Sequence, residues 1–145
     1  MFLLDTDVLS WSAPDREPPP RVQEWARAET ENLFLSTITV AEIETGIATA
    51  VGKGALRKAD RLASWLEAVF EEFAGHILAF DLPASRNLGR LAEAARLAGH
   101  HPGFPDLAIA AIAQHHGYTV ATRNTRHFKP MGIPVLDPFA PPPQT

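Results

Sequence analysis

The chain has 145 residues, which is enough for one domain of ordinary size but not for two. It contains no cysteine, so disulfides, thiolate metal sites and a cysteine nucleophile are excluded, and only oxygen and imidazole groups remain as metal ligands. The formal net charge of −4 argues against a protein that coats nucleic acid through charge alone, although it allows an enzyme whose carboxylates bind cations that then meet a phosphate.

The first half of the chain alternates short apolar runs with helical patterns. Runs of consecutive apolar residues indicate buried strands, and apolar residues at three- and four-residue spacing indicate helices. The clearest amphipathic stripe covers residues 56–73, and Gly52 and Gly54 end the helix that precedes it. Strands are thus predicted at residues 2–4 and 33–36, and helices at residues 8–11, 22–29, 39–51 and 56–73.

The second half continues the alternation and contains one helix that is apolar throughout. Residues 107–113 carry no polar side chain, so this helix is predicted to be buried on all sides, and Gly117 ends it. Pro134 places the last strand at an edge of the sheet. The other elements predicted here are strands at residues 77–80, 118–122 and 133–136, and a helix at residues 85–98.

This alternation predicts an α/β fold, in which helices cover both faces of a mostly parallel sheet of four to five strands. One domain is expected over residues 1–137, followed by a proline-rich, loosely ordered tail at residues 138–145. The N-terminus has no secretory pattern, and no apolar run approaches the ~20 residues that span a bilayer. The sequence therefore predicts a cytoplasmic protein without a membrane segment.

Three acidic residues are placed where the chain reaches one edge of this sheet. Asp5 follows the first strand, Glu42 lies in the first turn of the helix after the second, and Asp106 begins the buried helix before the fourth. Arg123 and Asn124 come just past that fourth strand. Ligands of open α/β sheets bind beyond the carboxyl ends of the strands, so these side chains are expected to converge there. Clustered carboxylates repel unless a cation lies between them, and their hard oxygens favour Mg²⁺ or Mn²⁺.

Each acid also has an ordinary structural interpretation. Asp5 or Asp7 would suit the N-cap of the helix after the first strand. Thr39 and Glu42 fit a capping box, in which the glutamate bonds back to the threonine backbone. Asp106 suits the positive end of a helix dipole. Only their joint placement at one edge of the sheet favours a functional site.

Four stretches surround these positions: LDTDVL at residues 4–9, STITVAEI at 36–43, FPDLAIAAIA at 104–113 and VATRNTRHF at 120–128. With these motifs, in this order and at these separations, the chain resembles the PIN-domain family, and within it the small toxin ribonucleases of the VapC and FitB type. The resemblance runs from Phe2 to about Asp137. It implies a three-layer α/β/α domain that cleaves single-stranded regions of RNA with Mg²⁺ or Mn²⁺.

The resemblance also implies roles for single residues. Asp5 and Asp106 match the family's metal ligands, and Glu42 matches the acid that completes the catalytic site, directly or through water. Thr6 matches a hydroxyl residue beside the first aspartate. Many relatives carry a fourth acid at the position of Asn124 or close to His127; this chain has neither, although Asn124 offers an oxygen ligand. Arg123 is a candidate for stabilising the leaving 3′ oxygen.

Similar toxins form one half of an operon pair, and this resemblance implies the partners. A small antitoxin wraps such a toxin and often places a basic side chain in the acidic site. Such a toxin forms a homodimer, or its complex with the antitoxin forms a dimer of heterodimers. These complexes bind promoter DNA only through the antitoxin. The helices predicted at residues 40–51 and 56–73 offer apolar surface for this partner.

Two other functions remain open on the sequence. The run LDTDV also resembles the Asp-x-Asp motif of haloacid-dehalogenase-type phosphatases, with Asp5 as nucleophile and Asp7 as general acid. That chemistry needs a lysine and a further acidic pair after the fourth strand, where this chain has Arg123 and Asn124. The second alternative is a catalytically idle PIN-like module that only binds a partner or RNA, because the fourth acid is missing.

Overall fold

A five-stranded parallel sheet in the order β3-β2-β1-β4-β5 forms the centre of the molecule. The computed structural model describes residues 1–142 and 144. The sheet confirms the predicted α/β class, and β5 lies at an edge as predicted from Pro134. The strands are β1 (Phe2–Leu4), β2 (Leu33–Ser36), β3 (Ile77–Leu78), β4 (Thr119–Ala121) and β5 (Val135–Leu136).

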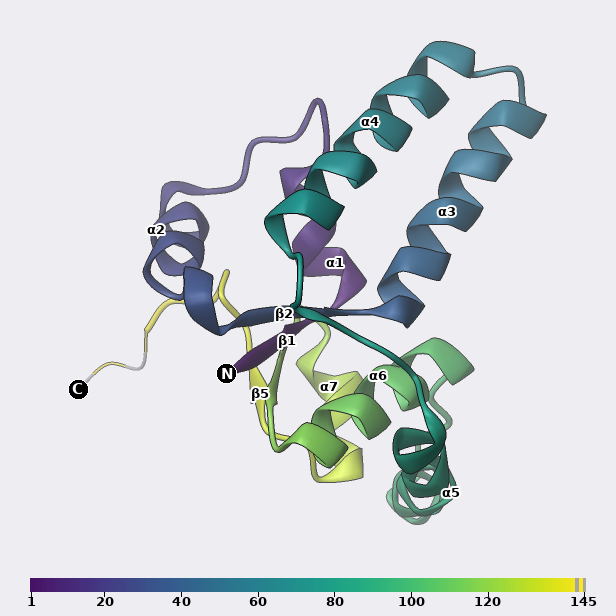
Figure 1. Cartoon of the computed structure of the whole chain (residues 1–145). Helices are drawn as coiled ribbons and strands as arrows, with labels where there is room; N and C mark the ends of the chain where they lie inside the picture. Colours follow the sequence, from purple (N-terminus) through teal and green to yellow (C-terminus); the bar gives the residue numbers. More distant parts are fainter. Residues whose placement is uncertain (143, 145) are drawn as a thin grey trace.

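Helices cover both faces of this sheet and give the expected three layers (Figure 1). On one face, α3 and α4 extend together away from the sheet, with α1 beside them; α5, α6 and α7 lie on the other face. In the part of the chain that the structure describes, no helix combines the length and apolar character needed to cross a membrane. The helices are α1 (Thr6–Leu9), α2 (Pro20–Ala28), α3 (Thr37–Gly52), α4 (Leu56–Glu72), α5 (Leu82–Leu97), α6 (Phe104–His116) and α7 (Thr125–Phe128).

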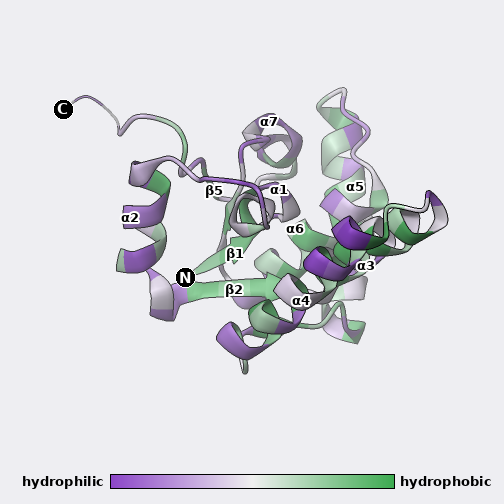
Figure 2. Cartoon of the chain, turned by 90° about the horizontal axis from the view of Figure 1, so that it is seen from above, coloured by the Kyte–Doolittle hydropathy of each residue, from purple (hydrophilic) through white to green (hydrophobic). Residues whose placement is uncertain are grey.

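The strands divide their side chains between two cores because successive residues of a strand point to opposite faces. Leu3 and Val120 belong to the core under α5 and α6, whereas the next residues, Leu4 and Ala121, belong to the core under α1, α3 and α4. Figure 2 shows the result, since the central strands are hydrophobic and the outer helices, such as α2, carry hydrophilic residues. This packing fixes the register of β1 beside β4.

Helix α6 is the most deeply buried helix of the domain. Its residues from Leu107 to Ala113 are all buried, as the uninterrupted apolar run predicted. Gly117 ends the helix in the left-handed conformation, with φ of 72°, which glycine adopts without a steric penalty. The first turn of α6 is thereby held at the edge of the sheet with Asp106 in it.

Helices α3 and α5 begin earlier than the sequence predicted, in both cases because a polar side chain caps the N-terminus. Helix α3 begins two residues earlier than predicted, because Ser36 is its N-cap and accepts a hydrogen bond from Thr39 N–H at 3.1 Å. The predicted capping box between Thr39 and Glu42 is therefore wrong, because Thr39 is not the N-cap of this helix. Helix α5 also begins earlier, since Asp81 caps it through Ala84 N–H. The short helix α7 was not predicted, because four residues carry too little periodicity.

The C-terminal segment begins against the domain. Pro138 is buried, and the ring of Phe139 lies 5.5 Å from that of Trp11. Residues 143 and 145 of the predicted tail lie outside the described residues. The division of the chain at residue 137 stays a prediction.

Candidate active site

Asp5 lies at the point where the strand order of the sheet reverses, between β1 and β4. The chain moves from β1 outward through β2 to β3, and returns to the other side of β1 with β4. Ligands of open α/β sheets bind at such a reversal, beyond the carboxyl ends of the strands. Asp5 N–H donates to the Ala121 carbonyl at 2.9 Å, so the backbone at the end of β1 is fixed against the end of β4.

The carboxylate of Asp5 is buried, with 6% of the residue exposed, and both of its oxygens are hydrogen-bonded. Oδ1 accepts from Thr6 N–H at 2.8 Å, which makes Asp5 the N-cap of α1, as one of the structural interpretations predicted. Oδ2 accepts from the hydroxyl of Thr122, a fully buried residue just past β4, at 2.9 Å. These two donors fix the orientation of the acid at the edge of the sheet.

Asp7 lies two residues further along, in α1, and faces the segment after β4. Its Oδ2 accepts from Arg123 N–H at 3.1 Å and from the Asn124 side-chain amide at 3.3 Å. Its Oδ1 is buried and has no hydrogen-bond partner among the described residues. A buried carboxylate oxygen without a donor is unfavourable, and a cation or a water molecule would satisfy it.

Glu42 reaches the same edge from α3 and is connected to Asp5 through a single residue. The Thr6 hydroxyl donates to Glu42 Oε1 at 2.7 Å, while the Thr6 backbone donates to Asp5. The Thr6 and Thr39 hydroxyls lie 3.0 Å apart, and Thr39 is fully buried under the first turn of α3. The glutamate is thus an exposed acid on a fixed support, and it does not cap its own helix.

Asp106 enters from the first turn of α6 and is paired with a histidine. His127 of α7 hydrogen-bonds to Asp106 Oδ2 through Nδ1 at 3.0 Å. The side chain of Asp106 is 26% exposed and that of His127 is 47% exposed, so the pair is open to solvent. His127 occupies the region where relatives were expected to have a fourth acid, and here it acts on Asp106.

Burial and like charge make Asp5 an unusual carboxyl group. Burial is the main cause that raises its pKa from 3.8 to about 7, and the charge of Asp7 is the second. Asp106 lies close enough for its charge to raise the pKa of Asp5 further. The hydrogen bonds from Thr122 and Thr6 lower the pKa of Asp5 and only partly oppose these effects. Burial also raises the pKa of Asp7. A divalent cation beside these groups would favour their ionised forms.

The carboxylates at this edge suit an open, hydrated cation site better than one in which the protein supplies every ligand. Within the described residues, no group of three or more acidic or histidine side chains could hold a metal ion by itself. Mg²⁺ commonly keeps several waters and is held by only one or two carboxylates. Asp5 and Asp106 offer such a pair, and the oxygen of Asp7 that lacks a partner is next to it. The residues therefore fit a hydrated Mg²⁺ or Mn²⁺ ion.

Some of the site residues predicted from the sequence contact one another directly, and others do not. Asp5, Thr6 and Glu42 form one hydrogen-bonded series, and Asp106 is close enough to Asp5 to affect its pKa. Asn124 contacts the site through Asp7. Arg123 contributes its backbone N–H, whereas its guanidinium lies 4.7 Å from the ring of Phe139 and pairs with no carboxylate among the described residues.

Sequence reasoning missed two supporting residues and undervalued a third. Thr122 was taken as part of a strand, and His127 only as a position where an acid is absent. Asp7 was considered only as a cap or a phosphatase acid, although it joins β1 to the segment after β4. The signal for Thr122 was its place at the carboxyl end of the strand next to Asp5. No local signal pairs His127 with Asp106, 21 residues away.

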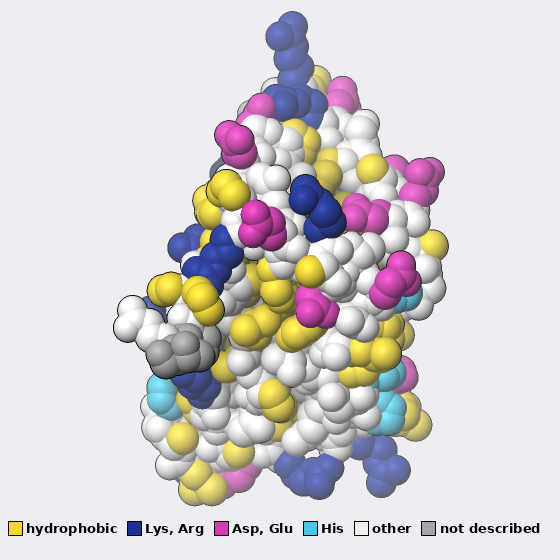
Figure 3. All heavy atoms as spheres, turned by 90° about the vertical axis from the view of Figure 1, so that its left-hand side faces the viewer, with side chains coloured by type: hydrophobic (Ala, Val, Ile, Leu, Met, Phe, Trp, Pro, Cys, Tyr) yellow, Lys and Arg dark blue, Asp and Glu magenta, His cyan; other side chains and the backbone are white. Residues whose placement is uncertain are grey.

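An apolar cavity lies elsewhere, between α2 and the end of α4. It has a volume of about 550 Å³ and is lined mainly by apolar side chains, among them Leu9, Val22, Trp25 and Phe73. Figure 3 views this side of the molecule and shows hydrophobic side chains gathered in the middle of the face. Glu31 and Glu72 also line the cavity, but none of the acids of the sheet edge does. This hollow is therefore distinct from the candidate active site.

Comparison with known proteins agrees with the fold. The PIN domain family matches residues 2–132, which is most of the chain and includes Asp5, Glu42 and Asp106. The chain belongs to the PIN-domain family.

Individual relatives of this PIN domain cover almost its whole length. The plasmid stability protein StbB of Pseudomonas syringae pv. tomato is 42% identical over 96% of this chain and 99% of its own. The VapC ribonuclease Y4jK of Sinorhizobium fredii is 40% identical over 97% of this chain and 99% of its own. A solved structure of FitAB bound to an IR36 DNA fragment is 33% identical, has a TM-score of 0.81, and is matched over 97% of this chain and 96% of that one.

Proposed function

We propose that this PIN domain is a Mg²⁺- or Mn²⁺-dependent endoribonuclease, the toxin component of a toxin–antitoxin pair. The observation that carries the proposal is the placement of Asp5, Glu42 and Asp106 at one sheet edge, where burial and neighbouring acids raise the pKa of Asp5 to about 7. A site of this kind is suited to binding a cation that in turn binds phosphate. The similarity to a VapC ribonuclease over nearly the whole chain supports the choice of RNA as substrate.

Asp5 and Asp106 are the residues that would hold the metal ion. When bound, a divalent cation supplies positive charge that neutralises a phosphate oxygen and makes a water molecule more acidic. Thr6 and Thr122 keep the Asp5 carboxylate in place, and His127 does the same for Asp106. Such supporting hydrogen bonds orient metal ligands and fix their charge.

Glu42 is the residue that would orient the attacking water or accept its proton. Its carboxylate is exposed to solvent, and Thr6 holds one of its oxygens so that the other is free to contact water. In-line attack of water on phosphorus breaks the bond to the 3′ oxygen and leaves a 5′-phosphate and a 3′-hydroxyl. The RNA 2′-hydroxyl takes no part in this chemistry, so 2′-O-methylated RNA is expected to be cut as well.

The two rival functions receive no support from these observations. Family membership accounts for the LDTDV run that suggested a phosphatase, and Asp7 is held by backbone and amide donors of residues 123 and 124 instead of facing a lysine. The idle module was suggested by the absence of a fourth acid. His127 now provides a contact to Asp106 at that place, which keeps the remaining acids in a defined arrangement.

The proposed partner is a small antitoxin protein, which would also connect the toxin to promoter DNA. The similar FitAB structure was solved on a DNA fragment, and this supports a complex in which DNA is contacted through the second protein. A homodimer or a dimer of toxin–antitoxin heterodimers is the proposed assembly. Exposed apolar residues at the outer end of the α3–α4 pair, Val51 and Leu56, offer surface for such contacts.

The proposal is tested by incubating the purified, partner-free chain with mixed RNA and a DNA control, in Mg²⁺, in Mn²⁺ and in EDTA. Cleavage of RNA that needs the cation, leaves 5′-phosphate ends and disappears in Asp106→Asn is the expected result. The exposed Asp60 on α4 provides the matched control, since Asp60→Asn should cut RNA at the parent rate. A folded chain that cuts no RNA under any condition would contradict the enzyme and favour the idle module.

A further inference from the structure

A polar hollow of about 470 Å³ lies directly beside the acidic edge. Its size is within the range of small-molecule sites, roughly 300–1,000 Å³. It adjoins the apolar cavity near α2 through Trp11, which lines both hollows, and it shares Asp7 with the candidate active site. The lining residues are Asp7, Ser10, Trp11, Arg16, Arg123 and Asn124.

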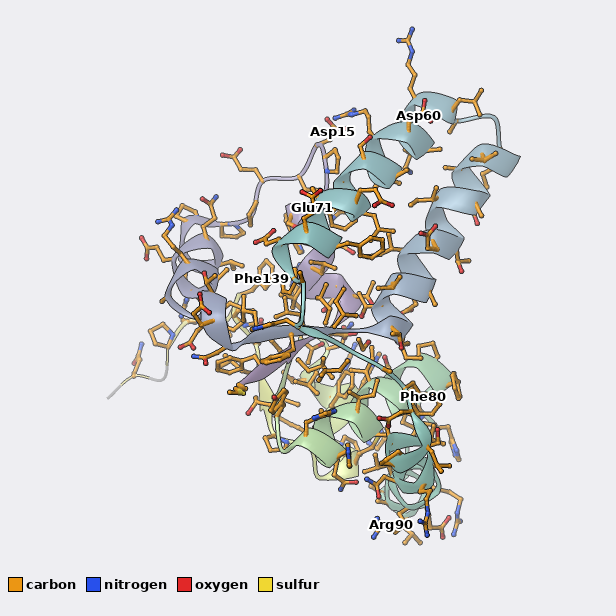
Figure 4. All side chains as sticks on the ribbon, viewed as in Figure 1. Asp15, Asp60, Glu71, Phe80, Arg90 and Phe139 are labelled. Carbon is orange, nitrogen blue, oxygen red and sulfur yellow. The ribbon has the colours of Figure 1, made fainter. Side chains whose placement is uncertain are left out.

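The walls of this hollow combine an aromatic ring with two cationic side chains. The guanidinium of Arg16 lies 5.4 Å from the centre of the Trp11 ring, and that of Arg123 lies 5.7 Å from it. Phe139, which is labelled in Figure 4, completes the group. Its ring centre lies 5.5 Å from that of Trp11. Neither guanidinium forms an ion pair with a carboxylate among the described residues. Their positive charge is therefore available to an anionic ligand.

The floor of the hollow offers hydrogen-bonding groups next to these rings and cations. The Asn124 side-chain amide and the Asp7 carboxylate are both at its surface and bond to one another at 3.3 Å. Amide and carboxylate groups are the side chains that read the edges of nucleic-acid bases. The two residues also connect the hollow to Asp5, because Asp7 follows it on α1.

These features are the combination with which proteins bind single strands of nucleic acid. Unpaired bases stack on aromatic side chains and on the planes of arginine, while the backbone follows positive charge. The whole chain has a net charge of −4, so local cations have to offset its repulsion of a polyanion. Arg16 and Arg123 provide such charge at the border of the acidic edge.

We propose that this hollow is a nucleotide subsite, in which one unpaired nucleotide next to the cleaved bond stacks on Trp11 and is held by Arg16. The proposal rests on the proposed ribonuclease function and assigns the side chains that bind its substrate. It makes Trp11 and Arg16 binding residues without a part in the bond-breaking step. Short single-stranded RNA is the ligand class, and a duplex whose bases are all stacked is excluded by the same geometry.

The proposal is tested with fluorescently labelled short single-stranded RNA in EDTA, where the chain's own side chains carry the binding and cleavage does not interfere. Trp11→Ala and Arg16→Ala should each weaken the affinity about tenfold, the first because it removes the ring on which a base stacks and the second because it removes a cation. Trp11→Phe should retain most of the affinity. Arg16→Ala should also reduce the slope of log affinity against log salt concentration by about one, because one fewer counterion is released on binding. Arg57→Ala, at the exposed outer end of α4, is the control and should bind like the parent.

Cleavage in Mn²⁺ by the same proteins separates this proposal from the proposed function. A parent chain that cuts RNA while both Ala variants keep full RNA affinity would overturn the subsite and leave the ribonuclease intact. If the parent chain binds RNA in EDTA, both variants weaken this binding, and no protein cleaves RNA in Mn²⁺, the result would support the subsite and contradict the proposed ribonuclease function. A parent chain that binds no RNA in EDTA would also overturn the subsite. Urea unfolding of each variant checks that it is folded. If Trp11→Ala does not fold, Arg16→Ala still tests the proposal, because Arg16 lies on an exposed loop.

Discussion

Two neighbouring regions at the ends of β1 and β4 have opposite chemical character. On one side, Asp5 is buried among other acids, and its pKa is raised to about 7. On the other, Arg16 and Arg123 are exposed beside the ring of Trp11 and pair with no described carboxylate. The first region is suited to holding cations, and the second to holding an anion with a flat ring. A chain of net negative charge can thus present separate surfaces for chemistry and for substrate at a single sheet edge.

The largest effect that would sharpen this division is expected from Glu42→Gln. The substitution keeps the size of the side chain and removes the charge that would orient or deprotonate water, so RNA cleavage should slow by roughly 10²- to 10³-fold. RNA affinity in EDTA should change little. Glu44→Gln, on an exposed position of the same helix, is the matched control for single-turnover cleavage assays. A Glu42 variant that lost affinity and kept its rate would break the division between the two regions.

A change in stability with pH is the next largest effect, and it comes from Asp5. Its pKa is about 7 in the folded chain and 3.8 as the ordinary value, so the folded chain binds more protons between these two pH values. Stability contributed by this group should thus fall as the pH rises from about 4 to about 7. Asp5→Asn removes the loss and should be more stable than the parent at about pH 8 by a few kcal/mol, at about 1.4 kcal/mol per pKa unit.

Urea unfolding at acid and alkaline pH measures this difference between Asp5→Asn and the parent. Near pH 4 the advantage of the variant should disappear, because the parent's carboxyl group is then protonated as well. Added Mg²⁺ should narrow the gap at about pH 8, since a cation stabilises only the charged carboxylate. Equal stability of the two proteins at both pH values would show that Asp5 is not strained by its burial.

The pair of His127 and Asp106 is expected to give a smaller effect, on cation affinity. Removing a hydrogen bond to a metal ligand weakens metal binding by about 10- to 100-fold, and His127→Ala should do so for Mn²⁺. His127→Asn can still donate from a nitrogen near the position of Nδ1 and should recover most of the affinity. Calorimetric titration with Mn²⁺ measures both variants without depending on cleavage. Equal losses in Asn and Ala would mean that the imidazole acts in another way.

The smallest effect is expected from the ion pair that holds the loop before α2. Arg61 on α4 pairs with Asp15 at 2.6 Å, and Asp15 is adjacent to Arg16 (Figure 4). Both partners are exposed, so the pair should contribute little to stability. Arg61→Ala should leave the urea midpoint nearly unchanged and weaken RNA affinity less than about threefold, through a more mobile Arg16. A loss as large as that of Arg16→Ala would show that the loop, not the hollow, determines binding.

Much of the fold follows from local patterns in the sequence. The apolar runs predicted the strands and α6, the period of about 3.6 residues predicted α3 to α5, and Gly117 ends α6 as expected. Boundaries moved where a polar side chain competed for a backbone N–H, as Ser36 does at α3 and Asp81 at α5. These caps depend on which of several nearby hydroxyl or carboxyl groups reaches the free donor, and composition does not distinguish them.

Short-range patterns were enough to predict which acids approach the sheet edge, because they locate the end of a parallel strand and the start of a helix. The contacts of each acid, in contrast, depend on how distant parts of the chain pack together. Thr6 reaches Glu42 across 36 residues, and Asp7 reaches Arg123 across 116. Trp11 likewise contacts Phe139, which returns from the other end of the chain. These contacts require β1 and β4 to lie side by side in one register, and that register is set by the two cores that pack against opposite faces of the sheet.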